Sequence, residues 1–238
     1  LLKRALAGIE QQGIHEFVVV VDEGDDLLRH SIEHDSDISA RITWVEQPLG
    51  AGPARGLAAA RAHINAPVLA LHCNLLFSPG MVGPLVDLDQ SNARPTLLVD
   101  FKLRRLFDPD AVLKVRTEED RVAAVGFDLE DHDAVAVGLA VLTPEVLDEM
   151  AHRGEGVASL GELLQPLVDS GRIHAWDING ALWQQVHNAE TRRHGEWMLR
   201  AYGEDLHDNA APAKPRRGSS ERTLSYIEGL LSEKNARH

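Results

Sequence analysis

Apolar residues along the first half of the chain recur with periods that alternate between helix and strand. Residues 1–9 carry Leu, Ala and Ile side chains spaced as on one face of a helix, which Gly13 ends. Residues 17–21 form a continuous run of Phe and Val, which is typical of a buried parallel strand. By the same reasoning we expect strands at 42–45 and 68–72, and helices at 25–32 and 57–64.

The second half reads differently, because strands there cluster before the helices. Residues 96–100 and 134–142 predict strands, and residues 111–115 and 122–126 predict the two arms of a hairpin. Pro144 is typical of the first turn of a helix. Later segments predict a helix at 160–168, strands at 173–177 and 182–186, and a helix at 189–202.

The β-α-β-α-β order of the first half predicts a doubly wound sheet with helices on both faces. We therefore expect an α/β fold, a three-layer α/β/α sandwich with a mostly parallel, partly mixed central sheet. Ligands bind such sheets off the carboxyl ends of the strands. Two segments fall on that edge, the glycine-rich stretch 47–57 and His72-Cys73-Asn74.

The expected domain covers residues 1–203. Residues 204–220 are polar and contain prolines, which predicts a linker. Residues 221–238 predict an amphipathic helix with Leu224, Ile227 and Leu231 on one face, leading to a possible further domain. The chain begins without Met and ends in a charged tail, so we expect a piece of a longer polypeptide.

Composition excludes several classes of function. The 238 residues carry a net charge of −13, which argues against nucleic acid as a partner because phosphate backbones need a basic face. No apolar run approaches the length of a membrane span, about 20 residues. A single cysteine, Cys73, and no visible signal peptide fit a cytoplasmic protein.

The glycine-rich segment from Gln47 to Leu57 is the most informative chemical feature. It holds Gly50, Gly52 and Gly56 between a predicted strand and a predicted helix. Glycine lets the backbone approach a ligand closely, and such loops bind nucleotides in α/β proteins. A loop of this kind can also simply turn the chain, so its neighbours decide between the two interpretations.

The order of segments resembles the nucleotidyltransferases that activate sugar phosphates and phospho-alcohols, above all the cytidylyltransferases for inositol phosphate, phosphocholine or aminoethylphosphonate. This is a MobA-like, GT-A-type fold family. The resemblance covers about residues 1 to 200 and rests on an ordered set of matches. These are Leu1 to Leu6 with Gly13-Ile14-His15-Glu16, Gln47 to Gly56, Cys73 to Pro79, Val99-Asp100 with Leu113-Lys114-Val115 and Gly138, and Trp183 to Thr191.

Departures from the family pattern concern charge. The family's first strand and its triphosphate-holding loop would lie before Leu1. The two aspartates that hold metal in the family correspond to Asn74 and Gln185. Where the family has an acidic residue, this chain has Ala136. Where the family has a lysine, this chain has Phe127. Mg²⁺ is expected for the family but doubtful here, because amides offer only neutral oxygen atoms. No metal ligand is predicted.

The resemblance implies roles for particular residues. It implies that Lys114 contacts the acceptor's phosphate, although a solvated hairpin lysine explains it equally well. It makes Asp100 a catalytic candidate that could replace a metal ligand. The alternative is that Asp100 only forms a turn at the end of its strand. Gly138 and Trp183 are substrate-binding candidates, and Trp183 also reads as a core residue. The nucleotide-binding candidates are Gln47, Gly50, Ala51, Gly52 and Asn74.

Two hypotheses follow. In the first, the chain transfers a cytidylyl or other nucleotidyl group from a nucleoside triphosphate, CTP favoured, to a small phosphate- or phosphonate-bearing acceptor and releases pyrophosphate. In the second, it is a degenerate, non-catalytic domain that binds nucleotide or supports a fused enzyme. The resemblance implies that a fused C-terminal domain would be a lipid-alcohol transferase or a phosphonate aminotransferase; without a lipid-transferase motif in the tail, a soluble partner is favoured.

Overall fold

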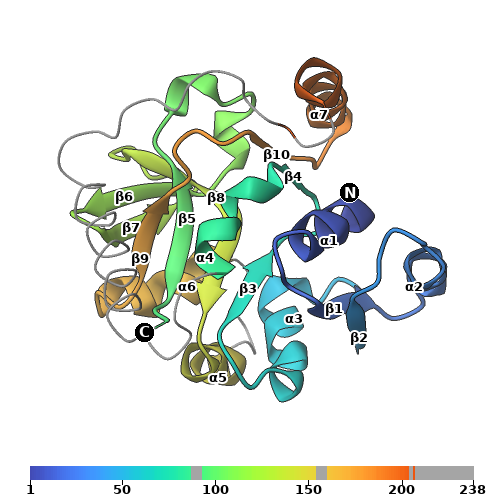
Figure 1. The fold of residues 1–238 in the computed structure, drawn as a ribbon. Helices are drawn as coiled ribbons and strands as arrows, with labels where there is room; N and C mark the ends of the chain where they lie inside the picture. Colours follow the sequence, from blue (N-terminus) through green and yellow to red (C-terminus); the bar gives the residue numbers. More distant parts are fainter. Residues whose placement is uncertain (87–92, 154–159, 204–205, 207–238) are drawn as a thin grey trace, which may run out of the picture.

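The computed structural model describes residues 1–86, 93–153, 160–203 and 206 (Figure 1). Strands and helices alternate from the first helix to about residue 71, and a strand-rich region follows. The elements are α1 (Leu2–Glu10), β1 (Glu16–Asp22), α2 (Asp26–Glu33), β2 (Arg41–Gln47), α3 (Gly52–Ala60), β3 (Val68–Leu71), β4 (Leu75–Phe77), α4 (Gly83–Val86), β5 (Thr96–Asp100), β6 (Lys114–Glu118), β7 (Arg121–Gly126), β8 (Ala134–Leu142), α5 (Pro144–Arg153), α6 (Leu160–Asp169), β9 (His174–Asp177), β10 (Trp183–Gln185) and α7 (Ala189–Tyr202).

Three groups of paired strands hold the fold together. A six-stranded sheet has the order β3-β8-β5-β9-β7-β6, with a further pairing of β8 to β6. β1 and β2 form a separate parallel pair, and β4 pairs with β10 antiparallel. In Figure 1 the β1–β2 pair lies apart from the six-stranded sheet, beside α2 and α3.

The α/β class and the mixed central sheet are confirmed, but the sheet is less parallel than expected. In the six-stranded sheet the one parallel pair among the described strands is β5 with β9. The cause is β8, which returns between β3 and β5 and runs antiparallel to both. The periodicity of one strand does not determine its neighbour's direction.

The core has a layer on each face of the sheet, as the side chains of β5 illustrate. Leu97 and Val99 pack on one face against α3, α5 and α6. Leu98 packs on the other face with Ile9 of α1 and Phe77 of β4. Each is almost fully buried, and burying a side chain of this size stabilises the fold by roughly 1.5–3 kcal/mol. Burial of both faces gives the predicted three layers.

Several predicted boundaries differ from the structure, and two of these differences have a clear local cause. The helix expected from residue 57 begins at Gly52, because Pro53 fits the first helical turn and Gly52 adopts a φ of 80° that turns the chain into it. The first hairpin arm runs over Lys114–Glu118 rather than 111–115, because Pro109–Ala111 forms a turn of 3₁₀ helix. The last helix has the expected bounds.

The chain stays in the core slightly beyond the predicted domain boundary. Leu206 falls inside the predicted linker, yet it is 1% exposed and packs with Leu76 and Met198. The remainder of the linker and the predicted amphipathic helix at 221–238 lie outside the described residues. The domain therefore includes at least Leu206. No helix in the described part of the chain combines the length and the apolar character that crossing a membrane requires.

Candidate nucleotide site

The glycine-rich loop is held at the carboxyl edge of the parallel β1–β2 pair by Asp22. Asp22 and Gln47 are paired at the ends of the two strands. Gln47 Nε2 donates a hydrogen bond to Asp22 Oδ1 at 2.9 Å, and the backbone N–H of Gly50 donates to Asp22 Oδ2 at 3.3 Å. One carboxylate thus fixes both a predicted side chain and the loop backbone. Sequence reasoning missed Asp22, although its place at a strand end was the available signal.

Glycine has two different uses in this loop. Gly50 and Gly52 have φ values of 73° and 80°, and no atom lies within 4 Å of where a Cβ would be. They leave open space above the backbone. At Gly56 a Cβ would meet Gln47 Oε1 at 3.2 Å, so this glycine makes room for the Gln47 side chain. Within the described residues Gln47 Oε1 is buried and has no hydrogen-bond partner.

Asn74 and Gln185 are brought together by the β4–β10 pair. Leu75 pairs with Gln185, and the backbone N–H of Val186 donates to the carbonyl oxygen of Asn74 at 2.8 Å. Asn74 Oδ1 is buried and lacks a hydrogen-bond partner among the described residues. The two amides therefore occupy neighbouring segments, as the comparison of motifs implied.

Gly138 and His72 lie beside this amide pair. Gly138 has a φ of 92°, and a Cβ there would be 3.0 Å from Gln185 Nε2 and 3.9 Å from His72 Cβ. The N–H of His72 donates to the carbonyl oxygen of Gly138 at 3.2 Å. Burial lowers the pKa of His72 below its ordinary value, so its imidazole is neutral at physiological pH. Gly138 gives the Gln185 side chain its space.

Asp100 and Lys114 lie in one row across the sheet. Both pair with Val135, on opposite edges of β8, so their side chains share a face and their strands are about 10 Å apart. Asp100 is buried, and both of its oxygen atoms are engaged. Oδ1 accepts from the backbone N–H of Lys102 at 2.8 Å, and Oδ2 accepts from Trp183 Nε1 at 2.9 Å. Asp100 thereby positions Trp183.

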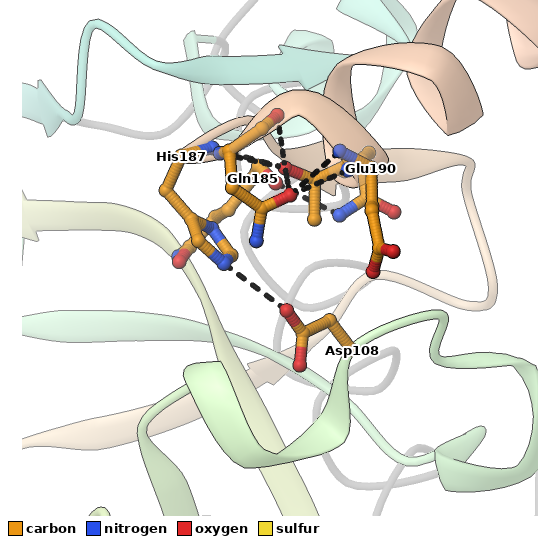
Figure 2. A network of polar contacts seen from close by, with 7 residues as sticks. Asp108, Gln185, His187 and Glu190 are labelled. Carbon is orange, nitrogen blue, oxygen red and sulfur yellow. Dashed lines mark hydrogen bonds and ion pairs between the residues drawn. The ribbon is translucent and has the colours of Figure 1, made fainter.

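A polar network follows Gln185 along the chain (Figure 2). His187 Nε2 lies 3.1 Å from Asp108 Oδ2, and the Asn188 side chain accepts from the backbone N–H groups of Glu190 and Thr191 at 2.9 Å. A shallow pocket beside this network is lined by Phe107, Glu190, Arg193 and His194. Asp108 lies in an irregular segment between 3₁₀ turns, so no periodicity or motif pointed to it.

The residues at the family's metal positions do not fit Mg²⁺. This ion prefers an octahedron of oxygen ligands with carboxylates among them. Asn74 and Gln185 supply neutral amides, and Ala136 supplies nothing. In the described part of the chain, no three His, Cys, Asp or Glu side chains are grouped so that they could hold a metal ion. Asp100, the expected replacement, already binds Lys102 and Trp183.

No protein-family model matches this sequence, and no curated protein matches it either. Solved structures do match. The inositol-1-phosphate CTP transferase from T. maritima superposes with a TM-score of 0.73 at 20% identity, covering 88% of this chain and 84% of that one. A Bacillus anthracis protein assigned as a glucose-1-phosphate thymidylyltransferase gives 0.70 at 12% identity, with 87% and 84% covered.

A third structure, apo UDP-glucose pyrophosphorylase, gives a TM-score of 0.65 at 13% identity and covers 84% of this chain and 85% of its own. Identities this low establish a shared architecture only. The three structures nevertheless span most of this chain, and the first two are named as a CTP transferase and a thymidylyltransferase. The chain therefore shares the fold of these structures, in agreement with the resemblance of its segment order.

Proposed function

We propose that this chain is a nucleotidyltransferase-type domain. It binds a nucleoside triphosphate, with CTP preferred, together with a small acceptor that carries a phosphate or phosphonate group. The observation that carries the proposal is the Asp22-held loop, with open space above Gly50 and Gly52 at the carboxyl edge of a parallel strand pair. The structural likeness to a CTP transferase supports the choice of base.

The proposed roles follow from position. Gln47 and the backbone of Gly50, Ala51 and Gly52 contact the base, and the N-terminus of α3 favours negative charge nearby. Lys114, half-buried on the face that carries Asp100, contacts the acceptor's phosphate. Asp100 acts through Trp183, which it holds by a hydrogen bond.

The proposed reaction is an in-line displacement at the α-phosphorus of the nucleotide. An acceptor oxygen forms the new P–O bond while the bond to the β-phosphate oxygen breaks, and pyrophosphate leaves with that electron pair. Catalysis of this kind depends mainly on alignment and on stabilisation of charge. The chain's contribution is to hold the base through its loop and the acceptor's phosphate through Lys114.

A second candidate function is nucleotide binding without turnover, which the amides at Asn74 and Gln185 favour. Charge stabilisation at the reacting phosphates would then be too weak for transfer. In that case the domain would supply nucleotide binding to a fused enzyme. Both candidates require the same loop to bind nucleotide.

Calorimetric titration of the full chain with CTP, UTP and dTTP tests the binding step, and pyrophosphate release tests transfer. The acceptors are inositol phosphate, phosphocholine and aminoethylphosphonate. We expect CTP to bind most tightly and one acceptor to stimulate pyrophosphate release. Binding without release would select the second candidate, whereas no binding of any of these nucleotides would reject both.

The variant Gly52→Val tests the loop directly, with Gly203→Val as its control. Both glycines have a φ of 80° and nothing within 4 Å of the Cβ position, so both substitutions place a side chain at a positive φ and carry a backbone strain of about 1–3 kcal/mol. Only the first places a branched side chain in the space proposed for the base. We expect CTP affinity to fall roughly tenfold or more in Gly52→Val alone. Equal affinities in the two variants would contradict the site.

A further inference from the structure

Two carboxylates near the amide pair of Asn74 and Gln185, those of Asp100 and Asp108, are already engaged by other residues of the described chain. Asp100 is buried and accepts from Lys102 and Trp183. Asp108 is engaged with His187, two residues beyond Gln185. Asp100 and Asp108 are therefore committed to contacts within the protein, and Glu190 lies at the start of α7 (Figure 2).

Charge at this position decides how phosphate can be held. Two carboxylates would repel a phosphate group unless a divalent cation lay between them. Two amides carry no charge, and each offers N–H donors that a carboxylate lacks. Gln185 Nε2 lies over Gly138, whose missing Cβ leaves it room, and the neighbouring His72 is neutral. The side chains at the two positions, Asn74 and Gln185, are thus both neutral.

We propose that this site binds its nucleotide without a divalent cation, the amide N–H groups of Asn74 and Gln185 donating to phosphate oxygens. This inference rests on the proposed nucleotide-binding function and specifies the form of the ligand, a metal-free nucleotide. It also gives the two amides a function of their own. Their N–H donors take the place of the cation that the aspartates at these positions in the family would bind.

The test is calorimetric titration of the full chain with CTP, once in excess EDTA and once in excess Mg²⁺. We expect the two affinities to agree within about twofold. The double variant Asn74→Asp/Gln185→Asp should behave in the opposite way, with affinity weakened in EDTA and raised at least about tenfold by Mg²⁺. Asn179→Asp/Gln11→Glu is the matched control, because it adds the same charge on other elements and should stay insensitive to Mg²⁺.

The outcomes separate this inference from the proposed function. Loss of CTP binding in EDTA, with binding retained in Mg²⁺, would overturn the inference and leave the proposed function standing. Absence of CTP, UTP and dTTP binding in both conditions would overturn the two together. If the double variant fails to fold, the CTP affinities of the unchanged chain in EDTA and in Mg²⁺ still test the inference. The single variant Asn74→Asp can then be titrated under the same two conditions.

Discussion

At the scale of single residues, the titratable side chains of the site are either held by hydrogen bonds or kept neutral by burial. Asp22 and Asp100 are both used as braces, one for the glycine-rich loop and one for Trp183. The Asp100 carboxylate is buried, so removing one of its donors would leave a buried acceptor unsatisfied and would be costly. His72 shows the complementary case, a titratable side chain kept neutral by burial.

His72 should make folding stability depend on pH. Its pKa in the folded chain lies below its ordinary value of 6.5, so the unfolded chain binds more protons between these two values. Its contribution is therefore complete above pH 6.5 and decreases as the pH falls from 6.5 toward the lowered pKa. The slope cannot exceed about 1.4 kcal/mol per pH unit.

Urea unfolding between about pH 7.5 and about pH 5.5 measures this effect. We expect His72→Gln to flatten the decrease in the free energy of unfolding on acidification. His63→Gln, at an exposed histidine, is the control and should leave the slope unchanged. Parallel pH profiles for the parent chain and His72→Gln would contradict the assignment.

At the scale of elements, short segments fix the position of the site. The β4–β10 pair places Asn74 beside Gln185, and α7 begins directly after His187. A capping box starts α7, in which Asn188 accepts from the N–H of Thr191 and the Thr191 hydroxyl interacts with the N–H of Asn188. The start of α7 therefore helps to hold His187 against Asp108.

Asn188→Ala should weaken the start of α7. Removal of an N-cap side chain costs about 1 kcal/mol, within a range of roughly 0.5–2 kcal/mol. The exposed helical variant Arg192→Ala is the control and should change stability by less than about 0.5 kcal/mol. Urea denaturation of the full chain provides both values. An Asn188→Ala variant as stable as Arg192→Ala would show that the capping contacts contribute little.

At the scale of the whole molecule, the core extends at least to Leu206. This side chain packs with Leu76 next to the Asn74 segment and with Met198 of α7. It joins the end of the described chain to the elements that carry the site. The burial of Leu206 therefore extends the core beyond residue 203, and the predicted linker stays a prediction for the residues after it.

Limited proteolysis of the full chain should cut between residues 207 and 222 and leave a stable core that ends beyond Leu206. Leu206→Ala should lower the free energy of unfolding by about 2–5 kcal/mol, as for other fully buried leucines. Leu49→Ala, at a side chain 84% exposed, is the control and should have little effect. Fast cutting within residues 1–203 of the parent would show that the boundary is misplaced.

The sequence by itself determined the α/β class, the kind and order of most elements, and the glycine-rich loop at a strand's carboxyl end. These features are local, because periodicity and turn residues report on neighbours along the chain. The segment order also sufficed to point to the nucleotidyltransferase fold.

Only the tertiary structure decided which distant residues meet. Asn74 lies beside Gln185 because β4 pairs with β10, and Asp100 shares a row with Lys114 because both pair with Val135. Such contacts depend on strand direction, on register and on irregularities like the shift between Leu97 and Val99. A single strand's pattern of apolar residues is the same for many registers, so it does not specify these contacts.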